Sequence, residues 1–146
     1  MRVLALDYGS ARCGCAVSDP TGTIVTPIEP VERAATRRGL ARLRALVAER
    51  EVEMVLVGLP LSLDGSDSAQ TRETREFAER LAGALDHRVP VELYDERFTT
   101  RLAQRSAAGG GSARASEDSR AAAHLLESWL ASGAGAPSGS DGGDSR

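Results

Sequence analysis

The hydrophobic and polar positions divide the first part of the chain into short apolar runs. Residues 2–6 are almost wholly apolar, which is typical of a central strand whose two faces are both covered. Apolar runs over residues 13–18 and 23–28 follow, joined by the sequence Asp-Pro-Thr-Gly at 19–22. In such a turn proline presets φ and glycine accepts a positive φ. The first 28 residues therefore predict an antiparallel meander of three strands.

Beyond residue 36 the apolar period lengthens from two residues to between three and four, as in amphipathic helices. The apolar faces of two predicted helices consist of Leu40, Leu43, Leu46 and Val47, and of Phe77, Leu81 and Leu85. Apolar runs over residues 54–57 and 91–94 predict two further strands of the buried kind. Two more helices are expected over residues 99–107 and 117–131.

The order of these elements is three strands, helix, strand, helix, strand, helix. Strands joined through helices must run parallel, by right-handed crossovers. The chain is therefore predicted to be an α/β protein with a mixed five-stranded sheet, an antiparallel meander plus parallel strands, flanked by helices. This is the ribonuclease-H-like topology, although the order alone also fits other mixed α/β folds. We expect one domain over residues 1–131 and a disordered, Gly/Ser-rich tail over 132–146.

The distribution of charge along the chain is more informative than the net charge. The chain has a formal net charge of −3, and all of its basic side chains are arginines. Between residues 97 and 116 there is no acidic residue but there are four arginines, namely Arg97, Arg101, Arg105 and Arg114. This stretch could contact phosphates, or it could be a solvated helix face.

Cysteine content and hydropathy indicate an ordinary soluble protein. Cys13 and Cys15 share one strand face at a spacing that fits disulfide geometry poorly. We interpret them as small buried apolar residues rather than metal ligands or a redox pair. The sequence shows no signal peptide and no apolar run that approaches the length of a membrane span, so a cytoplasmic protein is the default expectation.

Three acidic residues lie where the predicted fold places one cleft. Asp7 and Glu96 each follow a strand at its carboxyl end, where ligands bind in open α/β sheets. Asp118 begins the helical stripe of Ala122, Leu125 and Trp129, so its side chain should point toward the sheet. Taken singly, each acid could instead cap a helix, pair with an arginine or form an acidic first helical turn. Their coincidence favours a shared site.

Carboxylates that lie close together repel each other, and a divalent cation relieves this repulsion. Hard oxygen ligands select Mg²⁺ or Mn²⁺. Two such ions about 4 Å apart could hold a phosphodiester, one activating water and the other stabilising the departing oxygen. Asp95 should face away from Glu96 on an extended segment and is a poor third ligand. The sequence does not place Asp64 and Asp67, on a polar loop, relative to this cleft.

Four short segments carry a resemblance to a known family. They are Leu6-Asp7-Tyr8-Gly9 with Arg12, Gly14 and Val17-Ser18-Asp19; Val57-Gly58-Leu59-Pro60-Leu61 with Asp64-Gly65-Ser66; Asp95-Glu96-Arg97-Phe98-Thr99-Thr100; and Asp118 with Ala121-Ala122 and Leu125-Leu126. Each segment is weakly specific, but together and in this order the chain resembles the YqgF family from Arg2 to about Leu130. Members of that family are described as Holliday-junction resolvases and as nucleases that mature the end of pre-16S ribosomal RNA.

The resemblance implies a ribonuclease-H-like nuclease whose catalytic, metal-binding acids are Asp7, Glu96 and Asp118. It implies Mg²⁺ or Mn²⁺ as cofactor, a role in rRNA processing and ribosome biogenesis, and nucleic acid as partner, either rRNA precursor or branched DNA. Ribosome-assembly factors could be protein partners. The expected nucleic-acid contacts are Arg12, Arg97, Arg101, Arg105 and Arg114. The family often has Asn where this chain has Ser62, aliphatic residues where it has Cys13 and Cys15, and lysines before the last Asp.

The sequence is compatible with three functions. The first is a metal-dependent endonuclease acting on pre-16S rRNA, and the second is a Holliday-junction resolvase. The third is a non-catalytic nucleic-acid-binding factor in ribosome assembly or transcription, which would keep the fold and the arginines but bind no metal. An actin-like phosphotransferase is discarded, because it needs a second similar domain and this chain is too short.

Overall fold

The computed structural model describes residues 1–62, 64–98 and 113–133, with the backbone alone for residues 98 and 113–118. The strands are β1 (Val3–Asp7), β2 (Arg12–Ser18), β3 (Val25–Glu32), β4 (Met54–Leu59) and β5 (Val91–Asp95). The helices are α1 (Arg37–Glu49), α2 (Ala69–Ala84), the 3-10 turn η1 (Glu96–Phe98) and α4 (Ala113–Ala131). The helix predicted over 99–107 lies outside the described residues, as does nearly all of the predicted tail.

The five strands form one mixed sheet in the order β3-β2-β1-β4-β5. The pairs β1–β2 and β2–β3 are antiparallel, whereas β1–β4 and β4–β5 are parallel. The predicted meander with two added parallel strands is therefore confirmed. β1 lies in the middle of the sheet, with a neighbouring strand on each side, and this explains why its sequence is almost continuously apolar.

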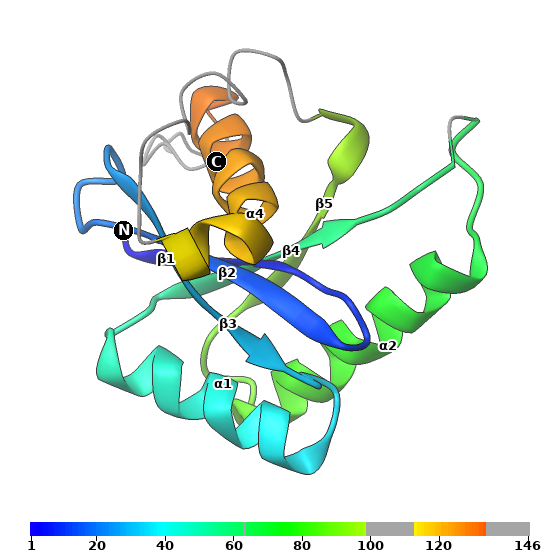
Figure 1. The fold of residues 1–146 in the computed structure, drawn as a ribbon, viewed down its shortest axis with the longest axis horizontal. Helices are drawn as coiled ribbons and strands as arrows, with labels where there is room; N and C mark the ends of the chain where they lie inside the picture. The colour runs from blue at the N-terminus through cyan, green and yellow to red at the C-terminus, as the bar shows by residue number, and fades with distance from the viewer. Residues whose placement is uncertain (63, 99–112, 134–146) are drawn as a thin grey trace, which may run out of the picture.

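Helices cover both faces of this sheet (Figure 1): α4 lies on one face, and α1 and α2 lie on the other. Residues of β1 alternate between the two layers. Leu4 and Leu6 pack in the core under α1 and α2, whereas Val3 and Ala5 pack against α4. The same alternation puts Asp7 on the α4 face and Tyr8 on the α1–α2 face. None of the helices in the described ranges is both long and apolar enough to span a bilayer.

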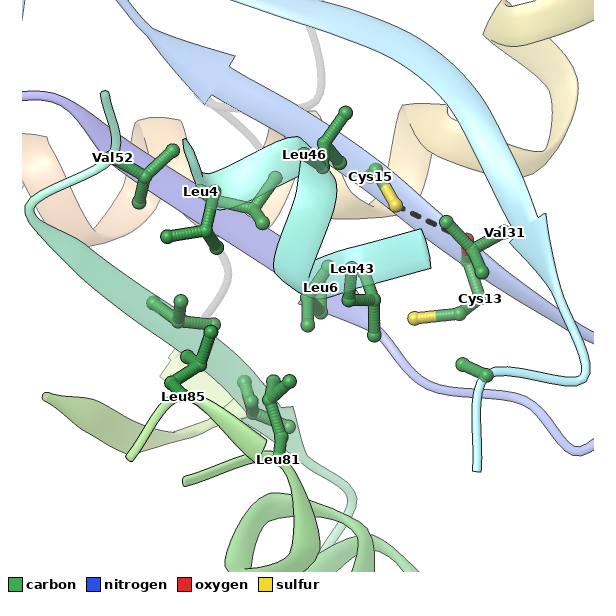
Figure 2. Packing of buried hydrophobic residues seen from close by; sticks show 14 of the residues in the cluster. Leu4, Leu6, Cys13, Cys15, Val31, Leu43, Leu46, Val52, Leu81 and Leu85 are labelled. Carbon is green, nitrogen blue, oxygen red and sulfur yellow. Dashed lines mark hydrogen bonds between the residues drawn. The ribbon is translucent and has the colours of Figure 1, made fainter. Parts of the chain in front are cut away.

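The two cysteines are part of the core under α1 (Figure 2). Cys13 and Cys15 are fully buried and free, and they share a face with Leu6 and Leu43. The thiol of Cys15 donates a weak hydrogen bond to the carbonyl oxygen of Cys13, at 3.4 Å. The interpretation of both as small buried apolar residues is confirmed.

The turn between β2 and β3 forms as the sequence predicts. Asp19 Oδ1 accepts hydrogen bonds from the backbone N–H groups of Thr23 and Ile24, at 2.8 and 3.0 Å. Gly22 has a φ of +74°, which a side chain would strain. The third strand, however, begins later than predicted and continues to Glu32. Its two prolines, Pro27 and Pro30, are tolerated because β3 is an edge strand with one partner.

The prediction that residues 91–94 form a buried strand was wrong. β5 is the other edge of the sheet, and the side chains of Glu92 and Leu93 are exposed, Leu93 by 39%. An edge strand has a neighbour on one side only, so an apolar sequence alone does not guarantee burial on both faces.

Ser119, the first residue of α4 whose side chain is described, fixes the helix to the sheet. Its fully buried hydroxyl accepts a hydrogen bond from the backbone N–H of Cys15, at 3.0 Å, and donates one to the carbonyl oxygen of Ile28. We expect Ser119→Ala to lower the free energy of unfolding by about 2 kcal/mol, because the buried N–H of Cys15 and the partly buried carbonyl of Ile28 lose their partner. Urea denaturation measures this. An unchanged denaturation midpoint would contradict the bridging role.

Candidate active site

The structure brings Asp7 and Glu96 together at the carboxyl end of the parallel strands. Asp7 is the last residue of β1, and Glu96 opens η1 directly after β5. The two strands are separated by β4, yet the carboxyl groups of Asp7 and Glu96 are hydrogen-bonded to each other. The predicted meeting of these two residues is therefore observed.

Gly58 makes this contact possible. It lies on β4 between the two acidic residues, and Glu96 crosses it on the α4 face. A Cβ atom at Gly58 would lie 2.7 Å from Glu96 Oε2, 3.0 Å from Glu96 Cγ and 3.0 Å from Leu125 Cδ2. A side chain here would therefore displace Glu96, so the glycine is required by the close approach rather than by an unusual φ.

Burial and mutual repulsion change the acidity of the pair. Burial raises the pKa of Asp7, partly offset by the hydrogen bond with Glu96. Burial first, and then the negative charge of Asp7, raise the pKa of Glu96 to about 7. Two carboxyl groups in contact cannot both ionise cheaply, so at neutral pH the pair tends to share a proton. A divalent cation bound between the two carboxylates would take the place of this shared proton.

The raised pKa of Glu96 predicts a pH-dependent effect of Glu96→Gln on stability in metal-free buffer. Below about pH 4 the carboxyl is protonated in both the folded and unfolded states, and the variant and the wild type should be equally stable. As the pH rises through the ordinary pKa of 4.5 to about 7, the unfolded wild type loses its proton more easily than the folded one. The wild type is thus destabilised relative to the variant, and the difference is complete above pH 7.

Glu96 is only partly buried, so solvent screening reduces the effect, and we expect the variant to be more stable by about 1–2 kcal/mol at pH 8. Thermal or urea denaturation at pH 4 and pH 8, both with a chelator present, measures the difference. A variant that is less stable than the wild type at pH 8 would show that the ionised carboxylate stabilises the fold instead.

The third predicted acid, Asp118, belongs to α4, but its side chain lies outside those described. The predicted stripe that follows it is confirmed, since Ala122, Leu125 and Trp129 are all buried. The next residue, Ser119, contacts Cys15 of β2, which pairs with Leu6, the neighbour of Asp7. Among the side chains that are described, no third His, Cys, Asp or Glu joins the pair to form a metal-binding group. A metal site with Asp118 therefore stays a prediction.

Arg97 is held in place by Asp95. Its Nη2 and Nε groups donate to Asp95 Oδ2 at 2.7 and 3.0 Å, and its backbone N–H donates to Asp95 Oδ1 at 2.9 Å. Its guanidinium also approaches the loop after β4, within 3.8 Å of where a Cβ of Gly65 would lie. Its positive charge contributes to the lowered pKa of Asp64, whose main cause is a hydrogen bond with Ser66. Asp64, which the sequence did not place, thus lies near the site.

The other predicted nucleic-acid contacts are described only in part. Arg12 is exposed at the start of β2, opposite Glu32 of β3. Arg101 and Arg105 lie outside the described residues, and so does the side chain of Arg114. Sequence reasoning missed the Asp95–Arg97 pair and the role of Gly58. A glycine inside an otherwise apolar strand was the signal that could have indicated a close approach there.

Comparisons with known proteins identify a family and relatives of the chain. A family model described as RuvX, Holliday junction resolvase, matches residues 1–132. A Mycobacterium tuberculosis protein named "Putative pre-16S rRNA nuclease" is 44% identical, with 96% of this chain and 86% of the relative covered. A Bradyrhizobium protein of the same name is 38% identical, with 88% and 81% covered.

Solved structures resemble the chain in fold. Thermus thermophilus RuvC has a TM-score of 0.60 at 16% identity, covering 91% of this chain and 97% of RuvC. The fowlpox virus resolvase in complex with Holliday junction DNA has a TM-score of 0.57 at 10% identity, covering 90% and 98%. At these identities the likeness concerns the fold alone, and it confirms the predicted ribonuclease-H-like architecture.

Proposed function

Because the chain belongs to the RuvX family of Holliday junction resolvases, we propose that it is a metal-dependent endonuclease that processes the 5′ end of pre-16S ribosomal RNA. The names of relatives at 44% and 38% identity support the RNA substrate. The observation that carries the catalytic part is the contact between Asp7 and Glu96, two carboxyl groups with raised pKa values at the carboxyl edge of the sheet.

The chemistry of these side chains fits a divalent cation. Asp7 and Glu96 supply hard oxygen atoms, which Mg²⁺ and Mn²⁺ prefer. Burial, and then repulsion by Asp7, raise the pKa of Glu96, and a cation between the two carboxylates would offset both effects. Asp7, Glu96 and, by our prediction, Asp118 would hold the ions. When bound, two such ions supply activation of the attacking water and stabilisation of the leaving oxygen.

Residues of the chain position the carboxylates and could contact the substrate backbone. Asp7 ends the central strand, whose pairing with β2 fixes the backbone from which its carboxylate extends. Glu96 is held against Gly58 and Leu125, which exclude water from one side of its carboxyl group. The Asp95–Arg97 pair places a guanidinium beside the site, where it could contact a phosphate of the bound strand. The arrangement thus combines carboxylates for the reacting phosphate with an arginine for the backbone.

A Holliday-junction resolvase is the second candidate, and a specific observation favours it. The description of the family model points to branched DNA, and RuvC, which shares the fold, is also known in complex with a Holliday junction substrate. The chemistry at the carboxylates would be the same in either case, so the two candidates differ in substrate shape and not in the site.

One assay separates the candidates. The purified protein is incubated with Mn²⁺ and a labelled panel of precursor 16S rRNA, junction DNA and duplex DNA, with Asp118→Ala alongside. We expect the precursor rRNA to be cut, and the variant to lose at least about 100-fold in rate, because a ligand of the ions is removed. Preferential, symmetric cutting of the junction would favour the resolvase. Binding of the RNA without cleavage would support a non-catalytic factor and contradict the proposal.

A further inference from the structure

The first long helix carries a basic surface in an otherwise acidic chain. Between residues 33 and 44 there are five arginines and no acidic residue, whereas the whole chain has a net charge of −3. All five side chains are exposed, namely Arg33, Arg37, Arg38, Arg42 and Arg44. Positive charge concentrated in this way attracts polyanions.

Two of these arginines line a groove of about 370 Å³ between α1 and α2. We call it the α1–α2 groove; its lining residues are Arg37, Leu40, Ala41, Arg44, Arg80 and Ala84. Three arginines thus line the groove together with three apolar residues, and no carboxylate of the described residues lines it. Arg44 contacts Asp86 at 3.4 Å, but both side chains are more than half exposed, so this ion pair is weak and can exchange for a phosphate.

The α1–α2 groove is connected to the proposed active site through Tyr8. This residue follows Asp7 and points to the opposite face of the sheet, where its ring stacks on Phe77 of α2 with centroids 4.4 Å apart. Arg80 lies three residues after Phe77 on the same side of α2. Burial, and then the negative charge of Glu73, raise the pKa of Tyr8, and the positive charge of Arg80 partly offsets them. The beginning of α1 is at the same edge of the sheet, because the Arg33 N–H donates to the carbonyl oxygen of Ala11, at 2.9 Å.

We propose that the α1–α2 groove binds the phosphate backbone of the RNA substrate beyond the cleavage site. The inference rests on the proposed function and extends it to a second binding surface. Arg37 and Arg44 are separated by about 10 Å along α1, a length over which an RNA duplex presents several phosphates. Arginine binds phosphate in a bidentate manner, without reading the sequence. The Arg37 end of the groove lies at the catalytic edge, where α1 begins, and this favours the substrate over an acidic protein segment.

Fluorescence anisotropy with a labelled RNA duplex that has a single-stranded 5′ extension tests the proposal. Binding is measured with EDTA over a range of salt concentrations, for the wild type and for the triple variant Arg37→Gln, Arg44→Gln, Arg80→Gln. We expect the affinity of the variant to fall at least about tenfold. We also expect the slope of log K against log salt to become shallower by about 2, at about 0.7–0.9 for each phosphate that an arginine no longer neutralises.

A matched triple variant, Arg2→Gln, Arg50→Gln, Arg88→Gln, removes the same charge. These arginines lie at the opposite edge of the sheet, before β1, after α1 and before β5. We expect it to bind within about threefold of the wild type. Equal weakening in both variants would overturn the proposal in favour of general charge attraction. RNA binding that is undiminished in the groove variant would also overturn the proposal. The ligand of the groove would then be an acidic protein segment rather than RNA.

The binding assay needs no catalysis, so its outcome is separate from that of the proposed function. If Asp7→Asn leaves cleavage intact while the groove variant binds RNA weakly, the assignment of the active site is wrong, whereas RNA binding by the α1–α2 groove is supported. If Asp7→Asn abolishes cleavage while the groove variant binds normally, only the groove proposal fails.

Discussion

Asp7→Asn is expected to reduce Mn²⁺-dependent cleavage by at least about 10³-fold, because the removed charge corresponds to several kcal/mol of stabilisation in the transition state. The same substitution should leave the melting temperature unchanged or raise it in metal-free buffer. The physical reason is that burial raises the pKa of the Asp7 carboxyl, so its ionised form is unfavourable in the folded protein. Cleavage rates with Mn²⁺ and thermal denaturation with EDTA measure the two effects.

Asp86→Asn is the matched control for this variant. Asp86 follows α2 at the other edge of the sheet and has a φ of +58°, a conformation that asparagine tolerates well. Its exposed ion pair with Arg44 is weak, so cleavage should stay within about twofold of the wild type. If Asp7→Asn cleaves as fast as this control, Asp7 is not a catalytic ligand.

Gly58→Ala is the second prediction with a large effect. A Cβ atom 2.7 Å from Glu96 Oε2 forces the carboxyl group to move. A displacement of about 1 Å in a catalytic group can reduce the rate about 10²-fold, and we expect a reduction of this size in kcat with a smaller change in KM. The free energy of unfolding should fall by about 1–3 kcal/mol because the site is overpacked.

Two further variants separate positioning from a general loss of structure. Gly83→Ala places a Cβ on α2 where no atom of the described residues lies within 4 Å, and it should stabilise the protein by about 0.5–1 kcal/mol with cleavage unchanged. In a protein that already carries Glu96→Gln, adding Gly58→Ala should reduce cleavage little further, because both act through the same carboxyl group. Multiplicative losses in the double variant would refute the positioning role.

The sheet order could be predicted because the apolar runs and helical periods of this chain are clearly separated. Residues 3–6 are apolar on both faces, and the structure places them in the middle of the sheet. The same reasoning failed at β5, where the charged residue Glu92 within the run was the signal of an exposed face. Strand position depends on which partners are available, and this is a property of the whole fold.

For two of the three acids, the sequence predicted that they meet but not how they contact each other. Asp7 and Glu96 each follow a strand, and parallel strands end at one edge, so their approach follows from topology. Their direct hydrogen bond depends on the close passage of Glu96 over Gly58. The ion pair of Asp95 with Arg97 depends on the turn η1, which begins at Glu96 and bends the chain back. Side-chain contacts of this kind are set by local backbone geometry that sequence periodicity does not specify.

We infer that Asp7, Glu96 and Asp118 bind divalent ions together on the α4 face of the sheet. A crystal structure of the protein grown with Mn²⁺, with anomalous scattering recorded to locate the ion, tests it most directly. We predict an anomalous peak within about 2.0–2.3 Å of oxygen atoms from Asp7 and Glu96, with the Asp118 carboxylate directed to the same ion or its neighbour. An Asp118 side chain turned to solvent, with no peak between the other two carboxylates, would contradict the account.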